Sequence, residues 1–215
     1  MDSNRILGTF KFSSTEHIRQ FAQGLLFMNT LQYFGSIEKN PARSDPHEGA
    51  SRIVQGRGAL LQIRTAGKWE PVGTILGPVH QLSDTNLRAN VFCMYALRTS
   101  AAHALVDMRA REFGEAFAVL IDHDEFMRRV KIAAVNCGHQ LHYDLVEYVD
   151  ETSYEGPMGL FKKGSGFSWQ SEFRIALLPG TGEPYRLDVG DLSDIVVVGS
   201  TSELNKRLRV AHAPK

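Results

Sequence analysis

Cysteine is scarce in this sequence, and there is no excess of charge of either sign. The 215 residues include two cysteines, and 24 basic side chains balance 24 acidic ones. Because Cys93 and Cys137 lie in apolar surroundings without metal-ligand spacing, we expect reduced, buried thiols rather than a disulfide. The zero net charge excludes a partner held by overall charge, such as duplex DNA or an anionic bilayer, and leaves a local basic patch open.

Long apolar runs are also missing. No segment approaches the roughly 20 consecutive apolar residues of a membrane span, and the first residues do not combine basic side chains with an apolar stretch. We therefore expect a cytoplasmic protein without a membrane partner.

Several motifs of well-known enzyme classes are absent. The sequence has no Gly-x-x-x-x-Gly-Lys phosphate loop, no Gly-x-Ser-x-Gly elbow and no His-Glu-x-x-His helix. His123 lies among acids that suit the start of a helix, and His139 and His142 have no carboxylate or cysteine at ligand spacing. The sequence therefore predicts no metal site.

The composition is that of an ordinary globular chain, with 43% hydrophobic and 22% charged residues, and we expect residues 1–215 to form one domain. A capping box at Ser13 and Glu16 predicts the start of a helix that Gly24 ends. Further helices are expected over 100–112, 122–135 and 202–209, and residues 36–57 read as a long loop. Strand patterns cover 6–12, 25–34, 59–64, 69–76, 90–97, 116–121, 140–149, 169–178, 185–187 and 194–198.

These strands outnumber the helices and occur in runs. The pattern predicts an α+β fold with a mixed, mostly antiparallel sheet and a few flanking helices, rather than a doubly wound parallel sheet.

The segment Trp169–Arg174 is the most informative part of the chain. In a strand, Gln170, Glu172 and Arg174 share one face, and Trp169 and Phe173 share the other. The polar face is either the solvated side of a half-buried strand or a site in which Glu172 accepts a hydroxyl or stabilises a developing cation. The Gly- and Lys-rich residues 161–167 before it are typical of a mobile segment that presents side chains to a substrate.

Gln170-x-Glu172 on a strand, preceded by a loop with aromatic residues, resembles the Gln/Glu-x-Glu signature of the ADP-ribosyltransferase fold. The resemblance implies NAD as co-substrate and Glu172 as the catalytic glutamate that engages its ribose. It also implies that Gln170 lies on the acceptor side and that Phe167 or Trp169 belongs to the acceptor-binding loop.

The beginning of the chain resembles DNA-targeting ADP-ribosyltransferase toxins and related bacterial proteins encoded near phage-defence genes. The likeness rests on the opening strand, helix and strand, on Tyr33-Phe34, and on Arg43-x-Asp45-x-x-Glu48 with its Asp-Pro-x-Glu loop. It implies that Lys11 and Tyr33 contact NAD, although known branches carry Arg or His where the first strand here offers Lys11. Arg43, Asp45 and Glu48 either clamp a pyrophosphate or ribose or simply hold their own loop together.

These features lead to a first hypothesis and two alternatives. The first is an NAD-consuming ADP-ribosyltransferase that modifies a protein or nucleic acid, acting as a toxin or anti-phage defence effector with an antitoxin or operon partner. The alternatives are a non-catalytic module on the same fold that senses a nucleotide or phage protein, and a nuclease using Asp45 and Glu48.

Overall fold

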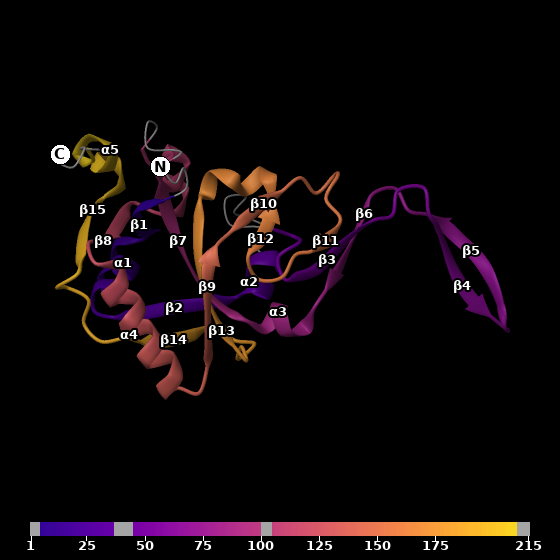
Figure 1. Ribbon diagram of the computed structural model, residues 1–215, viewed down its shortest axis with the longest axis horizontal. Coiled ribbons are helices and arrows are strands. Elements are labelled where there is room, and N and C mark those ends of the chain that lie inside the picture. Colours follow the sequence, from indigo (N-terminus) through magenta and orange to yellow (C-terminus); the bar gives the residue numbers. More distant parts are fainter. Residues whose placement is uncertain (1–4, 37–44, 100–104, 210–215) are drawn as a thin grey trace.

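The computed structural model describes residues 5–36, 45–99 and 105–209. Its largest sheet has eight strands, and a central member, β7 (Asn90–Arg98), pairs with three others (Figure 1). The expected α+β architecture with mostly antiparallel pairing is confirmed. The predicted contacts of Arg43 and the predicted helix cap at Ser100 lie outside the described residues.

The strands of the largest sheet are, besides β7, β1 (Ile6–Ser13), β2 (Leu25–Thr30), β8 (Ala116–Leu120), β9 (Gln140–Leu145), β13 (Glu172–Leu178), β14 (Tyr185–Asp188) and β15 (Val196–Ser200). The smaller sheets are built from β3 (Ala50–Gln55), β4 (Leu60–Thr65), β5 (Lys68–Thr74), β6 (Pro78–Leu82), β10 (Glu147–Val149), β11 (Gly156–Pro157) and β12 (Lys162–Gly164). The α-helices are α1 (Thr15–Ala22), α2 (Leu31–Ser36), α3 (Asp84–Arg88), α4 (His123–Asn136) and α5 (Leu204–Arg207), and 3₁₀ turns cover Met108–Phe113, Ser165–Gln170 and Thr201–Glu203.

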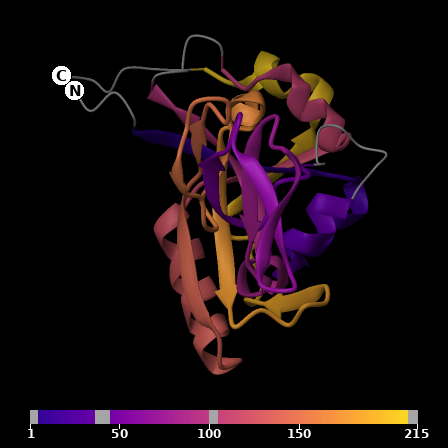
Figure 2. The same cartoon turned by 90° about the vertical axis from the view of Figure 1, so that its right-hand side faces the viewer.

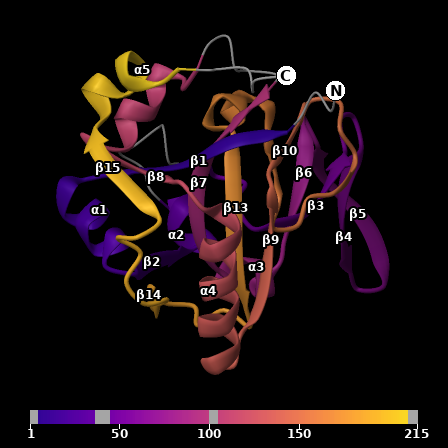
Figure 3. The ribbon, with the colours of Figure 1, turned by 60° about the vertical axis from the view of Figure 1, so that its left-hand side comes forward.

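The core lies on both faces of β7 because successive side chains alternate between them. Phe92 and Met94 point to the face that α1 and α4 cover, where they pack with Phe126 and Ile175. Figure 3 shows α4 in front of this face, beside β13 and β9. Tyr95 points to the opposite face and packs in a second cluster with residues of β1 and of the 3₁₀ turn at 108–113. Both faces are apolar, as the continuous hydrophobic run 90–97 predicts.

The two edges of β7 are used differently. One edge pairs with β13 from Asn90 to Tyr95. On the other edge, β1 pairs only with the end from Tyr95 to Arg98, and β2 pairs only with Asn90 and Val91. The sheet therefore splits between β1 and β2, beside residues 92–94 of β7.

A second, smaller part of the fold lies to one side of this sheet. β3 pairs with β6 and β11, and β10 runs parallel to β12. The β4–β5 hairpin extends away from the body, and its residues are exposed throughout (Figures 1 and 2). The strands predicted over 59–64 and 69–76 are confirmed as this hairpin, and Ala66 and Gly67 in its turn both have positive φ.

Several local predictions are wrong. Ser14, not Ser13, caps α1 by accepting from the amide of His17 at 3.3 Å, because Ser13 still belongs to β1, while Glu16 pairs with Arg19 instead of reaching the cap. The predicted loop 36–57 contains β3, which depends on partners far along the chain.

The predicted strand 25–34 stops at Thr30, because Thr30 Oγ1 accepts from the amide of Tyr33 and α2 begins. Both cysteines are free thiols, but Cys137 is exposed at the end of α4 and not buried as predicted. Within the described residues, no helix is long and apolar enough to cross a bilayer.

Gly24 ends α1 at a φ of 91°, and a Cβ added there would lie 2.0 Å from the carbonyl oxygen of Gly190. Gly138 ends α4 at a φ of 77°, and a Cβ there would meet nothing within 4 Å. We expect Gly138→Ala to lower the free energy of unfolding by about 1 kcal/mol through backbone strain alone. Gly24→Ala should cost about 1–3 kcal/mol more, because the Gly190 backbone must also move. Urea denaturation of both variants tests this, and equal losses would show that the close approach to Gly190 is unimportant.

Candidate active-site pocket

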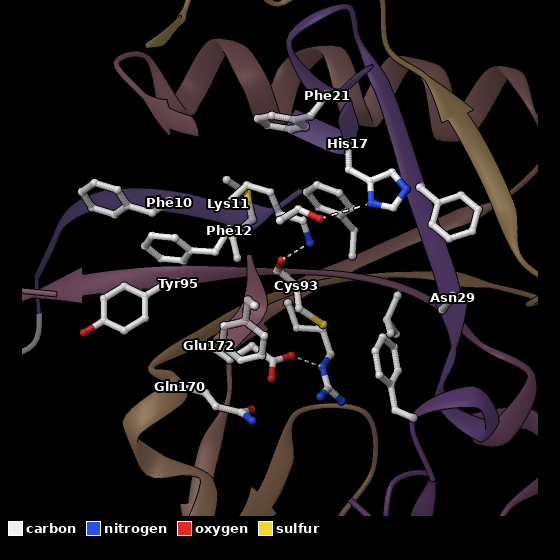
Figure 4. Close-up of a pocket in the computed structure, with 18 of the residues that line it drawn as sticks. Phe10, Lys11, Phe12, His17, Phe21, Asn29, Cys93, Tyr95, Gln170 and Glu172 are labelled. Atoms are coloured by element: carbon white, nitrogen blue, oxygen red, sulfur yellow. Dashed lines mark hydrogen bonds and ion pairs between the residues drawn. The ribbon is translucent and has the colours of Figure 1, made fainter. Parts of the chain in front are cut away.

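The split between β1 and β2 opens into a pocket with a volume of about 230 Å³. Figure 4 shows its walls, with residues of β1 and α1 on one side and Gln170 and Glu172 on the other. Aromatic rings form much of the lining, namely Phe10, Phe12, Phe21, Phe27, Tyr33, Phe34, Phe92, Tyr95 and Phe113. The polar lining includes Lys11, His17, Asn29, Gln170 and Glu172. Four of the sequence-predicted site residues, Lys11, Tyr33, Gln170 and Glu172, therefore meet at one pocket.

A buried pair of opposite charges forms the floor. Glu172 and Arg174 project from the same face of β13, as the alternation predicts, but they are only 4% and 1% exposed. Arg174 Nε donates to Glu172 Oε1 at 2.6 Å. The alternative of a solvated outer face is therefore wrong, because this side of β13 is covered by other parts of the chain.

Two further charges complete this network. Arg174 Nη2 donates to Glu48 Oε1 at 2.9 Å, and Arg174 Nη1 donates to the carbonyl of Leu160 at 2.6 Å. Lys163 of β12 lies 3.2 Å from Glu172 Oε2 and 3.3 Å from Glu48 Oε1. We call Glu48, Lys163, Glu172 and Arg174 the buried ion network. Its two acids and two bases balance, which is the condition for burying charge at tolerable cost.

The network sets the protonation state of Glu172, Lys163 and Arg174. Burial alone would raise the pKa of Glu172, but the charges of Arg174 and Lys163 and the hydrogen bond from Arg174 outweigh it and lower the pKa well below its usual range. Burial likewise opposes the charged forms of Lys163 and Arg174, yet the two carboxylates raise both pKa values. Glu172 is therefore an ionised carboxylate at neutral pH.

Gln170 reaches the pocket through a backbone irregularity. The sequence predicts Gln170 and Trp169 on the same strand as Glu172, but both belong to the 3₁₀ turn Ser165–Gln170, and β13 begins at Glu172. Ser171 between them has a φ of 41°, which is uncommon for a residue with a side chain. Its Oγ donates to the carbonyl of Ala96 at 2.6 Å, which holds this conformation. The kink brings Gln170 Oε1 within 3.0 Å of Lys163 Nζ, beside Glu172.

Lys11 occupies the split in the sheet. Its Nζ donates to the carbonyl of Cys93 at 2.8 Å, on the stretch of β7 that neither β1 nor β2 pairs with, and lies 4.2 Å from the centre of the Phe92 ring (Figure 4). The Cys93 thiol is next to Glu172, and burial together with that carboxylate raises the pKa of Cys93 to about 12. Cys93 is therefore a neutral thiol and a poor nucleophile.

The two predicted acceptor-loop residues lie near the pocket but not in its lining. Phe167 lies under Lys163, whose Nζ is 5.3 Å from the ring centre. Trp169 stacks on Phe113, which lines the pocket, at 5.5 Å between ring centres. The predicted mobile segment 161–167 instead contains β12, which pairs with β10, and the beginning of a 3₁₀ turn.

Asp45 and Glu48 do not line the pocket. Glu48 contacts Arg174 and Lys163 behind its floor, and its Oε2 is buried with no hydrogen-bond partner among the residues that the structure describes. Asp45 Oδ1 accepts from the amide of His47 at 2.9 Å, which is the loop-holding alternative that the sequence left open. The structure therefore favours the hypothesis that these acids stabilise the fold over the hypothesis that they bind a pyrophosphate or ribose.

The sequence names Glu48 and Glu172 as candidate site residues but does not link them into a network. The sequence places Lys163 in a predicted mobile segment, and it gives no signal for Tyr148, whose hydroxyl accepts from the amide of Glu172 at 2.9 Å. The sequence places Arg174 on the same strand face as Glu172 but does not single it out as a site residue. The alternation of Arg174 with Glu172 was the available signal, since two opposite charges on one face of a strand next to a buried run suggest a buried pair.

Comparisons with protein-family models, curated proteins and solved structures find no match to this chain. The chemistry of the pocket is therefore inferred from its geometry alone. An ionised, fixed carboxylate beside an amide, a lysine and several aromatic rings can bind a polar ligand with a planar ring and stabilise positive charge that develops on it.

We expect Arg174→Leu to lower the free energy of unfolding by about 3–5 kcal/mol near neutral pH, because two carboxylates would share Lys163. Arg128→Leu, which removes an exposed partner of Glu125, should change stability little. The folded pKa of Glu172 is lowered, so its stabilising contribution is present above the unfolded pKa and lost as pH falls through the folded value.

The difference between wild type and Arg174→Leu should accordingly shrink below about pH 4. Urea titrations of both proteins near neutral pH and in this acidic range measure it. A deficit no larger than that of Arg128→Leu would contradict the assignment of Arg174 as the centre of the network.

Proposed function

We propose that this protein is an NAD-consuming transferase of the ADP-ribosyltransferase type, with Glu172 as its catalytic carboxylate. The observation that carries the proposal is the ionised Glu172, held by Arg174 and Lys163 at the floor of an aromatic pocket. The resemblance of Gln170-x-Glu172 to the family signature supports the same assignment.

Glu172 has the hydrogen-bonding capacity that this role requires. Oε1 accepts from Arg174, Oε2 accepts from Lys163 and the Cys93 thiol also donates to the carboxylate, whose roughly four lone pairs leave one for a ribose hydroxyl. As the bond between the anomeric carbon and nicotinamide breaks, positive charge develops on the ribose, and the carboxylate stabilises it. Nicotinamide leaves with the bonding electrons, and the acceptor nucleophile forms the new bond at the same carbon.

Other pocket residues suit the remaining parts of the co-substrate. The aromatic walls provide faces on which a nicotinamide ring can stack, and Tyr33 stands 43% exposed beside Phe34 where such a ring would enter. Lys11 contributes a positive charge in the wall that would attract a pyrophosphate. Gln170, next to Glu172, would orient an acceptor from a protein or nucleic acid.

A non-catalytic nucleotide-sensing module is the second candidate. The observation that favours it is the electrical balance of the buried ion network, in which Arg174 and Lys163 neutralise Glu172 and Glu48 and reduce the field available for catalysis. The nuclease alternative has less support, because Glu48 is bound in this network and Asp45 in its own turn. The first proposal also includes a biological role: the protein acts as a toxin or phage-defence effector and has an antitoxin partner.

We expect wild-type protein incubated with labelled NAD and cell lysate to release nicotinamide or transfer label, and Glu172→Gln to do so at least about 100-fold more slowly. Glu147→Gln removes an exposed carboxylate nearby and should leave the rate unchanged. Because Glu172→Gln also unbalances the ion network, Glu172→Asp provides a second variant that keeps the charge but withdraws the carboxylate. We expect the circular dichroism spectrum of Glu172→Asp to remain that of the folded protein, while its rate of nicotinamide release falls.

Calorimetric titration with NAD separates the two candidates. If wild type and Glu172→Asp bind NAD and neither releases nicotinamide, the protein is a sensing module. If wild type neither binds nor consumes NAD, both the NAD-consuming and the NAD-sensing assignments are wrong.

A further inference from the structure

Three side chains from distant segments meet outside the pocket. His47 comes from the turn before β3, His80 from β6, and Glu151 from the turn after β10. His47 Nδ1 lies 2.8 Å from Glu151 Oε1, and His80 Nε2 lies 3.3 Å from the same oxygen. The two imidazole rings stack with their centres 3.5 Å apart and their planes 9° from parallel. Two ring nitrogens and a carboxylate thus converge on one point.

The backbone around each of these residues is held in place. β3 and β6 are paired with Ile53 opposite His80, and the amide of His47 is bound to Asp45 Oδ1. Hydrogen bonds from Thr152 to Asp150 close the turn that carries Glu151. The carbonyl of Glu151 accepts a further hydrogen bond from Gln55 Nε2 at 3.0 Å. Ligands fixed by such outer contacts are the usual property of a metal site.

The chemistry of the three groups selects a type of ligand. Two imidazole nitrogens directed at one carboxylate oxygen offer donor atoms to a cation, and together they match the His₂Glu set of zinc enzymes. Imidazole suits zinc, copper, iron and nickel, whereas magnesium and calcium prefer oxygen ligands. The side chains of His47 and Glu151 are 39% and 27% exposed, which leaves a side open to water for a further ligand.

We infer that His47, His80 and Glu151 form a binding site for a divalent transition metal ion, with zinc as the best match to the ligand set. Three protein ligands leave a fourth position of the tetrahedron for water. The inference does not depend on the proposed transferase activity. It also departs from the sequence-based expectation of no metal, which considered only histidines with neighbours close in sequence.

The site adjoins the buried ion network through two chain segments. His47 immediately precedes Glu48, and Glu151 Oε2 packs against Gly164, where an added Cβ would lie 2.2 Å away. Gly164 immediately follows Lys163. A bound ion would therefore restrain the segments that supply Glu48 and Lys163, and through them would help to position Glu172.

Zinc titration of the whole protein tests the site directly. After dialysis against EDTA, we expect one saturable Zn²⁺ site per chain by calorimetry, and one zinc per chain by elemental analysis after reloading. Zinc at a hundredfold excess over its dissociation constant should raise the melting temperature by about 5–10 °C. His80→Ala and Glu151→Gln should each weaken this binding at least about 100-fold and lose the thermal shift.

His142→Ala is the matched control, because His142 is an exposed histidine on β9 and should leave zinc binding unchanged. Circular dichroism of each EDTA-treated variant establishes that a loss of binding is not a loss of fold. Absence of a one-to-one site in wild type would overturn the inference and leave a hydrogen-bonded His–Glu cluster. Equal affinity in wild type, His80→Ala and Glu151→Gln would also overturn it, by moving the ion elsewhere. None of these measurements uses NAD, so they succeed or fail independently of the transferase proposal.

Discussion

The mutual dependence of four buried charges governs the middle of this structure. Arg174 on β13 could not be buried at tolerable cost without Glu172 and Glu48, and the charges of Arg174 and Lys163 keep Glu172 ionised there. The four residues come from β13, from β12 and from the turn before β3, so their pairing joins the large sheet to the smaller part of the fold. Hydrophobic residues of similar volume would often stabilise a core equally well, which makes this network a candidate for function as well as for stability.

The pocket exists because β1 and β2 pair with different ends of the same edge of β7. A single long strand beside residues 90–98 would pair with every carbonyl and amide of that edge, and no opening would exist. Because β1 and β2 each cover only one end, the carbonyl of Cys93 needs another donor, and Lys11 supplies it. The pocket beside this separation is lined by Lys11 and also by the buried Glu172 of β13.

Residues of the buried ion network and of the inferred metal site are neighbours along the chain. The turn 45–49 carries His47 and Glu48, and β12 carries Lys163 next to Gly164, against which Glu151 packs. We therefore expect a metal ion bound at the inferred site to restrain the segments that carry Glu48 and Lys163. The β4–β5 hairpin stands apart from this arrangement, because its exposed residues contribute nothing to either core cluster.

Local patterns in the sequence were sufficient for much of the fold. The continuous apolar run of β7, the alternation of β13 and the glycine after α1 are properties of neighbouring residues, and the corresponding elements were predicted from them. The likeness of Gln170-x-Glu172 to a known signature also directed attention to residues that do line one pocket. The kink at Ser171 was not predictable, because its unusual φ is held by a bond to Ala96, which lies far away in sequence.

Only the tertiary structure decided which charges are buried and which partners they have. Glu48 and Arg174 are separated by 126 positions, and His47 and Glu151 by 104, so no local pattern links them. The sequence by itself determined the α+β class, most strand positions and the polar face of β13. The burial of that face, the loop-holding role of Asp45 and the meeting of His47 with His80 and Glu151 depend on chain segments that come together only when the sheets have formed.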